Sequence, residues 1–325
     1  MKKNLPSCLA VPVLCVAVAG VSSTYAQSPQ SNPVVITGSR LAEPLADVLP
    51  SVSVISRQDI EKSQAPTLAD LLQGEAGVEF GRNGGPGSVT SFFLRGQNSV
   101  NTVILVDGVR TQVDGGGNLT VTDLPLDMIE RVEVLRGNAS ALYGEAAIGG
   151  VINIITRRSQ GQPKAYASLE VGSFQTRRAS VGYGGVSQDL SYDLQLGKSD
   201  SKGFSAIDPA LKPKANPDRD GSETTFGNVR FEKRLSASRQ LGLRLNAKST
   251  GTDFDTTSDT AADTHRFKTR TEGVNLFWRE AITEQWLSQL DLSHAHFAND
   301  SLKNGAIAVS YFGTPNGEYR GRQNS

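Results

Sequence analysis

Cysteine and histidine are scarce in this 325-residue sequence, and each shortage narrows the possible functions. Cys8 and Cys15 both lie in the first 26 residues, so a chain that loses this segment has no thiolate for a zinc site or a disulfide. Among three histidines, His294 and His296 would share one face of a strand, which we interpret as a polar pair. No nucleophile elbow or phosphate-binding loop is recognisable, so an enzyme is not expected.

A surplus of charge and long apolar runs are also lacking. The sequence has 33 Lys and Arg against 33 Asp and Glu. A nucleic-acid-binding surface needs excess cations to neutralise phosphates, so nucleic acid is not an expected partner. After the first 26 residues, no apolar run approaches the roughly 20 residues of a membrane helix. If the mature chain enters a membrane, a closed β-barrel is the remaining way to satisfy its backbone hydrogen bonds.

The N-terminus has the pattern of an export signal. A positively charged start precedes an apolar stretch over residues 9–21, and Ala26 ends a short run suited to cleavage. We therefore predict a signal peptide over residues 1–26. Residues 27–50 would form a polar periplasmic tail that contains one short β-branched segment, and such a segment can pair with the strand edge of a partner.

Hydrophobic patterns divide the mature chain into two domains. Residues 51–158 mix short strand and helix patterns, with a helix that ends at Gly74 and a buried-strand run at residues 103–106. Over residues 164–325, apolar and polar residues alternate instead, and residues such as 241–248 place two cations and an amide on one face. Such strands suit a soluble sandwich or a membrane barrel, and long polar loops that alternate with short turns favour the barrel.

Two of these polar loops carry closely spaced aspartates. Asp218 and Asp220 precede a glycine in one loop, and Asp253 and Asp255 lie at the start of another. Ca²⁺ takes about six to eight oxygen ligands from flexible loops, so these four carboxylates are candidate ligands. Solvated loop acids are the alternative. No covalent cofactor is expected.

Several segments resemble TonB-dependent receptors of the outer membrane of Gram-negative bacteria. The matching segments are Phe93–Gly96, Val106–Arg110, Ile129–Gly137, Ser140–Gly144 and Ala147–Thr156. The resemblance implies an α+β plug domain at residues 51–158, followed by antiparallel strands of a transmembrane β-barrel in outer-membrane lipid. Residues 164–325 would be the first part of that barrel. Roughly eight strand candidates are too few for a plugged barrel of about 22 strands, so we expect a truncated barrel.

The same resemblance places a TonB box at about residues 33–38. The implied contact residues for the TonB energy-coupling complex are Val34, Val35, Ile36, Thr37 and Gly38. Because no nucleotide-binding motif is recognisable, force transmitted through this segment would be the energy source that remodels the plug.

Within this family, the segment from Asn83 to Gly96 is most similar to cobalamin receptors. The similarity implies ligand contacts at Asn83, Val89, Thr90 and Ser91. It also implies a calcium site made by the loop aspartates, although Ser205 stands where a further aspartate is expected. The expected function is TonB-dependent import of cobalamin. A ferric-siderophore or haem receptor is the alternative within the class, and a secreted, non-transporting β-rich binding protein is the alternative outside it.

Overall fold

The computed structural model describes most of the chain after residue 50. The described residues are 34–35, 43–44, 51–85, 87–88, 90–111, 124–208, 210–213, 216–256, 260, 262–283, 285–313 and 319–323. Only the backbone is described at 34–35, 43–44, 310–313 and 319–323. The signal peptide predicted at residues 1–26 lies outside the described residues.

The first group of elements is short and mixed, as predicted for the plug. In chain order it comprises β1 (Val34–Val35), β2 (Glu43–Pro44), β3 (Ser51–Ile55), α1 (Arg57–Ser63), α2 (Leu68–Gln73), β4 (Val78–Arg82), β5 (Thr90–Leu94), β6 (Gln97–Asn98), β7 (Thr102–Val106), β8 (Val109–Arg110), β9 (Ile129–Arg136), α3 (Ser140–Tyr143) and β10 (Gly150–Thr156).

A five-stranded sheet in the order β3-β9-β10-β7-β8 organises this domain, and we call it the plug sheet. β10 pairs parallel with β7 and antiparallel with β9. Phe92, Ile129 and Ile152 are fully buried in the cluster on one side of the sheet. The apolar run predicted as a buried strand at residues 103–106 is β7, which confirms that prediction.

The helices begin where their capping residues predict. Ser56 and Asp59 form a capping box at the start of α1. The Thr67 side chain accepts a hydrogen bond from the Asp70 backbone N–H at the start of α2, and Gly74 follows its last residue. In each helix the N-cap side chain therefore satisfies one backbone N–H of the first turn. Among the described residues, no helix combines the length and apolarity needed to cross a membrane.

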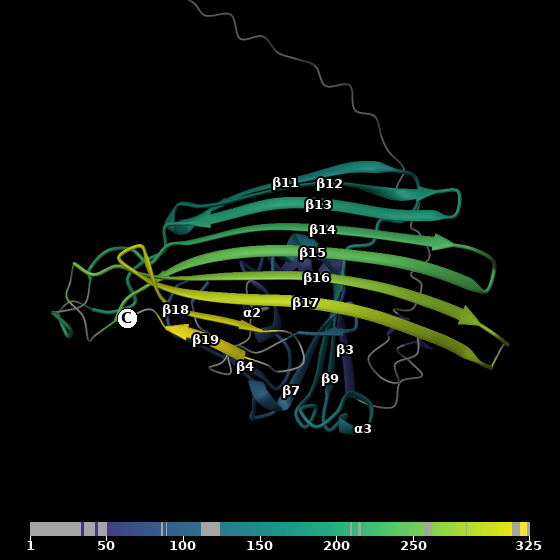
Figure 1. Ribbon diagram of the computed structural model, residues 1–325, viewed down its shortest axis with the longest axis horizontal. Coiled ribbons are helices and arrows are strands. Elements are labelled where there is room, and N and C mark those ends of the chain that lie inside the picture. Colours follow the sequence, from purple (N-terminus) through teal and green to yellow (C-terminus); the bar gives the residue numbers. More distant parts are fainter. Residues whose placement is uncertain are drawn as a thin grey trace, which may run out of the picture. The chain divides into compact units, whose positions relative to one another are not determined.

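The second group consists of long strands joined in sequence. They are β11 (Lys164–Gly172), β12 (Thr176–Ser187), β13 (Leu190–Ser201), β14 (Ser222–Arg234), β15 (Arg239–Phe254), β16 (His265–Ala281), β17 (Leu287–Lys303), β18 (Ala306–Gly313) and β19 (Tyr319–Gln323). Each pairs antiparallel with the next in chain order, and together they form one open sheet, the long sheet (Figure 1).

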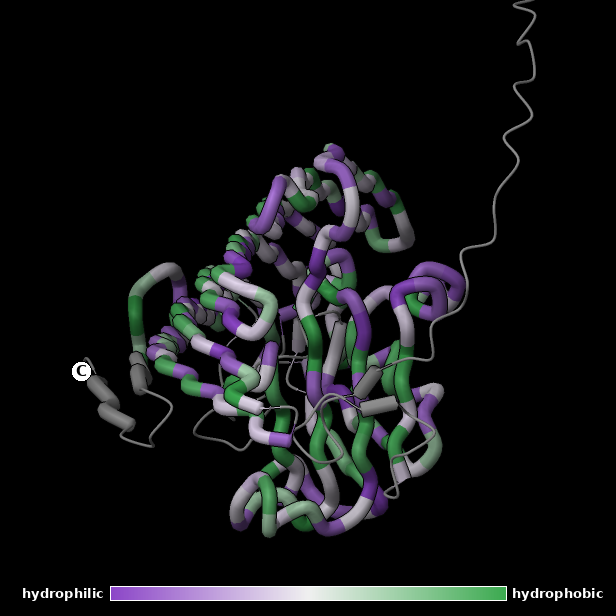
Figure 2. The backbone as a smooth tube through the Cα atoms, turned by 90° about the vertical axis from the view of Figure 1, so that its right-hand side faces the viewer, coloured by the Kyte–Doolittle hydropathy of each residue, from purple (hydrophilic) through white to green (hydrophobic). Residues whose placement is uncertain are grey.

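The two faces of the long sheet differ in polarity. Figure 2 shows how hydrophilic and hydrophobic residues alternate along its strands. On β15, Leu241 and Leu245 are exposed on the outward face, whereas Arg244 is only 5% exposed on the inward face, toward the plug sheet. Exposed apolar residues on the other strands include Leu169, Val181, Leu196, Val274, Leu276, Leu290 and Leu292. A soluble sandwich would bury this apolar face, whereas a membrane barrel presents it to lipid.

Candidate ligand, cation and anchoring sites

The segment predicted as the TonB box is described only at its start. Val34 and Val35 form β1, which pairs antiparallel with Glu43 and Pro44 of β2. This part of the segment has strand geometry, as its β-branched residues predict. Ile36, Thr37 and Gly38 lie outside the described residues, and the TonB contact stays a prediction.

The predicted ligand contacts surround the turn between β4 and β5. Asn83 is exposed directly after β4, and Ser91 is partly buried on β5. Thr90 is 4% exposed, and its hydroxyl donates to the Ser88 carbonyl at 2.9 Å. Val89 lies outside the described residues. Asn83 is thus the most accessible of the three described contacts, and Thr90 could meet a ligand only after this turn moves.

Glycines let the β4–β5 turn approach the long sheet closely. A Cβ added to Gly85 would lie 3.6 Å from the Phe204 ring, and one added to Gly87 would lie 2.7 Å from the Thr252 hydroxyl. Gly87 also has φ +84°, which L side chains rarely adopt. The predicted ligand turn therefore packs directly against the β13–β14 loop and β15.

The β13–β14 and β15–β16 loops bring three of the four candidate calcium ligands together. Carboxylate oxygens of Asp218, Asp220 and Asp255 lie within 4.8 Å of one another. The Ser205 hydroxyl, which stands where an aspartate was expected, donates to Asp255 Oδ2 at 2.7 Å. Asp253 instead accepts from Arg266 Nη1 at 2.9 Å. The oxygen-only donor set at the first three carboxylates fits a hard divalent cation.

Burial and mutual repulsion raise the pKa of two of these carboxylates. Partial burial, followed by the charge of Asp255, raises the pKa of Asp220 to about 6. Burial and the charges of Asp255 and Asp253 also raise the pKa of Asp218. Burial is the largest cause of both shifts, and repulsion between the neighbouring carboxylates adds to it. A bound divalent cation would offset that repulsion.

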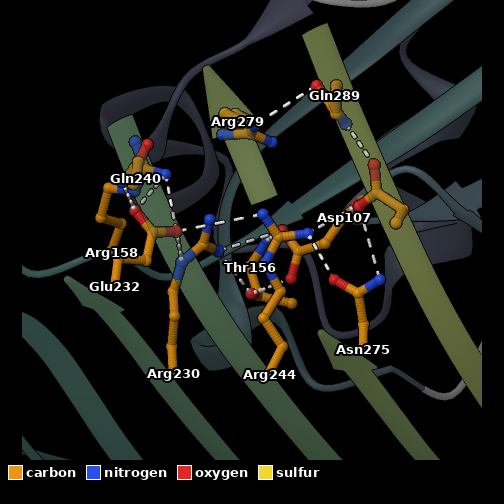
Figure 3. A network of polar contacts seen from close by, with 11 residues as sticks. Asp107, Thr156, Arg158, Arg230, Glu232, Gln240, Arg244, Asn275, Arg279 and Gln289 are labelled. Atoms are coloured by element: carbon orange, nitrogen blue, oxygen red, sulfur yellow. Dashed lines mark hydrogen bonds and ion pairs between the residues drawn. The ribbon is translucent and has the colours of Figure 1, made fainter. Parts of the chain in front are cut away.

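A second site lies inside the molecule, where a turn of the plug meets the long sheet (Figure 3). Asp107 directly follows β7, and its side chain is 8% exposed. Its carboxylate accepts from Arg230 Nη1 at 3.1 Å and from the Thr156 hydroxyl at 2.5 Å. Arg244 Nη1 donates to the Asp107 backbone carbonyl at 2.8 Å. Strands β14 and β15 thereby hold the turn between β7 and β8.

The charge of Asp107 is strongly favoured in this setting. Burial alone would raise the pKa of its carboxyl, but Arg230, Arg244 and the hydrogen bonds from Thr156 together lower it to about 2. The carboxylate is therefore ionised at any physiological pH. A buried charge of this kind is stable only while its partners remain in place.

Glu232 extends the network along the inward face of β14. It accepts from Arg230 Nε at 2.7 Å, from Arg158 Nη2 at 2.7 Å and from Gln240 Nε2 at 2.9 Å. Arg158 is the last residue of the plug, two residues beyond β10, so this second contact also joins the plug to the long sheet. The alternation over residues 241–248 indicates that Arg244 faces inward. No local signal indicates that its partner is Asp107.

The plug sheet is mixed, and it is anchored to the polar face of the long sheet. The other face of the long sheet is apolar. This arrangement defines the class of a plugged β-barrel receptor. The comparisons agree with this class. A family model described as the TonB-dependent receptor plug domain matches residues 44–151.

Two curated relatives are vitamin B12 transporters named BtuB. The one from Vibrio vulnificus is 41% identical over 209 residues, which cover 61% of this chain and 33% of the relative. The one from Vibrio cholerae is 35% identical over 197 residues, which cover 59% of this chain and 32% of the relative. The chain thus matches about one third of the length of these relatives.

Solved structures share the fold at low sequence identity. The ferric yersiniabactin uptake receptor FyuA from Yersinia pestis has a TM-score of 0.62 and 20% identity, over 82% of this chain and 50% of that one. The ferripyoverdine receptor of the outer membrane of Pseudomonas aeruginosa has a TM-score of 0.67 and 14% identity, over 87% and 39%. Residues 44–151 thus match the plug domain of TonB-dependent receptors, and the chain shares its fold with part of these solved receptors.

Proposed function

We propose that this protein works in the TonB-dependent import of cobalamin across the outer membrane, after export through a cleaved signal peptide. The observation that carries the proposal is the 41% identity to a vitamin B12 transporter over 209 residues. A ferric-siderophore or haem ligand is the alternative. The FyuA and ferripyoverdine receptors share the fold, but at 20% and 14% identity they say little about which ligand this chain binds.

The proposed ligand surface is the β4–β5 turn with Asn83 and Ser91. The proposed cation site consists of Asp218, Asp220 and Asp255. Because Gly85 lies against Phe204 of the β13–β14 loop, a cation that orders this loop would also support the turn that meets the ligand. Asp253 is left out of this site because it pairs with Arg266 at 2.9 Å.

The proposed energy source is the TonB complex, which would bind the segment Val34–Gly38 by adding it as a strand. Backbone hydrogen bonds supply the affinity in such a contact, and the side chains supply specificity. Tension on this segment acts on the same domain that Asp107 and Arg158 anchor to the long sheet. Import then requires the ion pairs of Asp107 and Arg158 with the long sheet to break.

A calorimetric titration of the purified protein with cyanocobalamin, with Ca²⁺ and with chelator, tests the proposal. We expect saturable binding that weakens when calcium is removed. Asp220→Asn should weaken binding in calcium to the level seen with chelator, because it removes a carboxylate from the site. Asp189→Asn, in the β12–β13 turn, is the matched control and should bind as the wild type does.

Other outcomes separate the alternatives. Binding of a ferric siderophore or haem, with no response to cyanocobalamin, would move the ligand to that class. Recovery of the mature protein in the soluble periplasmic or secreted fraction would support the non-transporting binding protein. Cobalamin binding unaffected by both chelator and Asp220→Asn would refute the cation site and leave the ligand assignment standing.

A further inference from the structure

Three exposed polar side chains lie side by side on the outward face of β16 and β17. In the register of these strands, His294 lies opposite Val274, and His296 lies opposite Glu272. Val274 is in turn the cross-strand partner of Leu245, which belongs to the outward face. The register therefore confirms that the two histidines share one face, and it adds a carboxylate beside them.

These side chains stand where the apolar part of the outward face ends. Along β17, Leu290 and Leu292 are 58% and 59% exposed, and the next two outward residues are the histidines. Along β16, toward the β15–β16 loop, the outward residues change in the same way from Leu276 and Val274 to Glu272. An apolar face of this kind meets lipid, so the polar side chains lie at its border, where dissolved ions have access.

None of the three side chains is engaged elsewhere in the described part of the chain. No hydrogen bond or ion pair there involves Glu272, His294 or His296. On the other side of Glu272 lies Ala247, which is too small to cover the carboxylate. The described pairing of β17 with β18 covers Phe297–Lys303 only, so no described residue of β18 stands opposite either histidine. The imidazoles and the carboxylate are thus available to a ligand.

Strand geometry suits chelation by these residues. Residues i and i+2 of a strand lie on one face, about 6 to 7 Å apart. Cross-strand partners have Cβ atoms about 4.5 to 5.5 Å apart. Two imidazoles at the first spacing can lean together and hold one ion between them, with metal–nitrogen bonds of about 2.0 to 2.1 Å. Unlike the carboxylates of the acidic loops, these donor atoms are not already gathered, so binding requires rotation about the χ angles of exposed side chains.

The donor atoms select the class of ion. Imidazole nitrogen suits Zn²⁺, Cu²⁺ and Ni²⁺, whereas the oxygen-only cluster in the acidic loops fits a hard cation such as Ca²⁺. The Glu272 carboxylate adds a third ligand and a negative charge. The next outward residue of β16 is Arg270, which lies opposite Ala298 and is exposed, so its guanidinium can turn away from a bound ion.

We propose that His294, His296 and Glu272 bind one divalent transition-metal ion of the Zn²⁺ type on the outward face of the long sheet. The two imidazoles supply most of the affinity, and the carboxylate supplies the third ligand. This site is distinct from the cation site of the acidic loops, whose clustered ligands are all carboxylates. It does not depend on the identity of the imported ligand.

Calorimetric titration of the purified, tag-free protein with ZnCl₂ tests the site, in excess Ca²⁺ so that the acidic loops are occupied. We expect saturable binding of one Zn²⁺ per chain. His294→Gln and His296→Gln should each weaken it at least about tenfold, because each removes a nitrogen ligand. Glu272→Gln should weaken it severalfold. His265→Gln changes the remaining histidine of the chain; it is the matched control and should leave binding unchanged.

Cu²⁺ used as a spectroscopic probe identifies the ligands directly. Every sample carries Cys8→Ser and Cys15→Ser, so that thiolates do not contribute. With one equivalent of Cu²⁺, electron paramagnetic resonance should show coupling to two imidazole nitrogens in this background. Addition of His294→Gln or His296→Gln should leave coupling to one.

Absence of saturable Zn²⁺ binding in excess Ca²⁺ would overturn the site, and so would equal affinity in the wild type and both histidine variants. A copper spectrum with oxygen ligands alone would also overturn it. The substituted side chains are exposed, so the variants are expected to fold, and each histidine tests the site independently. Because no cobalamin is present, failure here leaves the proposed import function intact.

Discussion

The buried contact between Asp107 and Arg230 provides the sharpest test of how the plug is held. Asp107→Asn keeps the shape of the side chain and removes its charge. The shift of the Asp107 pKa from 3.8 to about 2 corresponds to about 2 kcal/mol of favourable interaction with the ionised form. Loss of one partner of a buried pair costs about 3 to 5 kcal/mol. Arg230 keeps Glu232 at 2.7 Å, so we expect a loss at or below the bottom of this range, about 2 to 3 kcal/mol.

Hydrogen exchange shows whether this loss of stability is confined to the β7–β8 turn. The Asp107 and Thr111 backbone N–H groups donate to Ile154 and Ile104 at 2.8 Å, and these bonds report the β7–β8 turn. A local loss of 2 kcal/mol predicts about thirtyfold faster exchange there, with little change in β12 or β13. The double variant Asp107→Asn with Arg230→Gln should lose less protection than the sum of the two single variants, because both changes remove the same contact. Unchanged exchange at Thr111 in Asp107→Asn would refute the anchoring role.

Three further predictions follow from the same structure. Because the Asp107 pKa is lowered from 3.8 to about 2, its contribution should be complete above about pH 4 and lost as pH falls through 2, which unfolding as a function of pH can measure. Gly87→Ala should destabilise the protein by about 1 to 2 kcal/mol more than Gly96→Ala in chemical unfolding, because both have positive φ but only Gly87 has a close neighbour. Leu245→Lys should cost about 2 to 4 kcal/mol of folding into lipid bilayers, whereas Asn246→Lys on the inward face should cost less than half of that; equal costs would contradict the assignment of faces.

The sequence predicts the secondary structure of both domains well, for a local reason. Alternation over residues 241–248 appears as β15, and the apolar run at residues 103–106 appears as β7. A strand exposes alternate residues to opposite faces, so a linear pattern carries this information without knowledge of the neighbours. The motifs at residues 129–156 likewise identify the plug from the chain alone.

The candidate cation site shows where such prediction ends. Asp253 and Asp255 lie two residues apart and are equivalent as sequence. In the structure, Asp253 is the cross-strand partner of Arg266 and pairs with it, whereas Asp255 lies just beyond β15 and turns toward Asp218 and Asp220. The choice between an ion pair and a cation site depends on where β15 ends and on what stands opposite, and neither is encoded in the spacing of the aspartates.

The sequence by itself determined the class of protein, the alternating faces of the strands and the acidic character of the loops, because these depend on local order along the chain. Tertiary structure alone decided that Asp107 pairs with Arg230, 123 residues away, and that Asp255, not Asp253, joins Asp218 and Asp220. The interaction energy of two buried charges depends on the distance between them and on the local dielectric environment. Both quantities follow only from the folded arrangement of the plug against the long sheet.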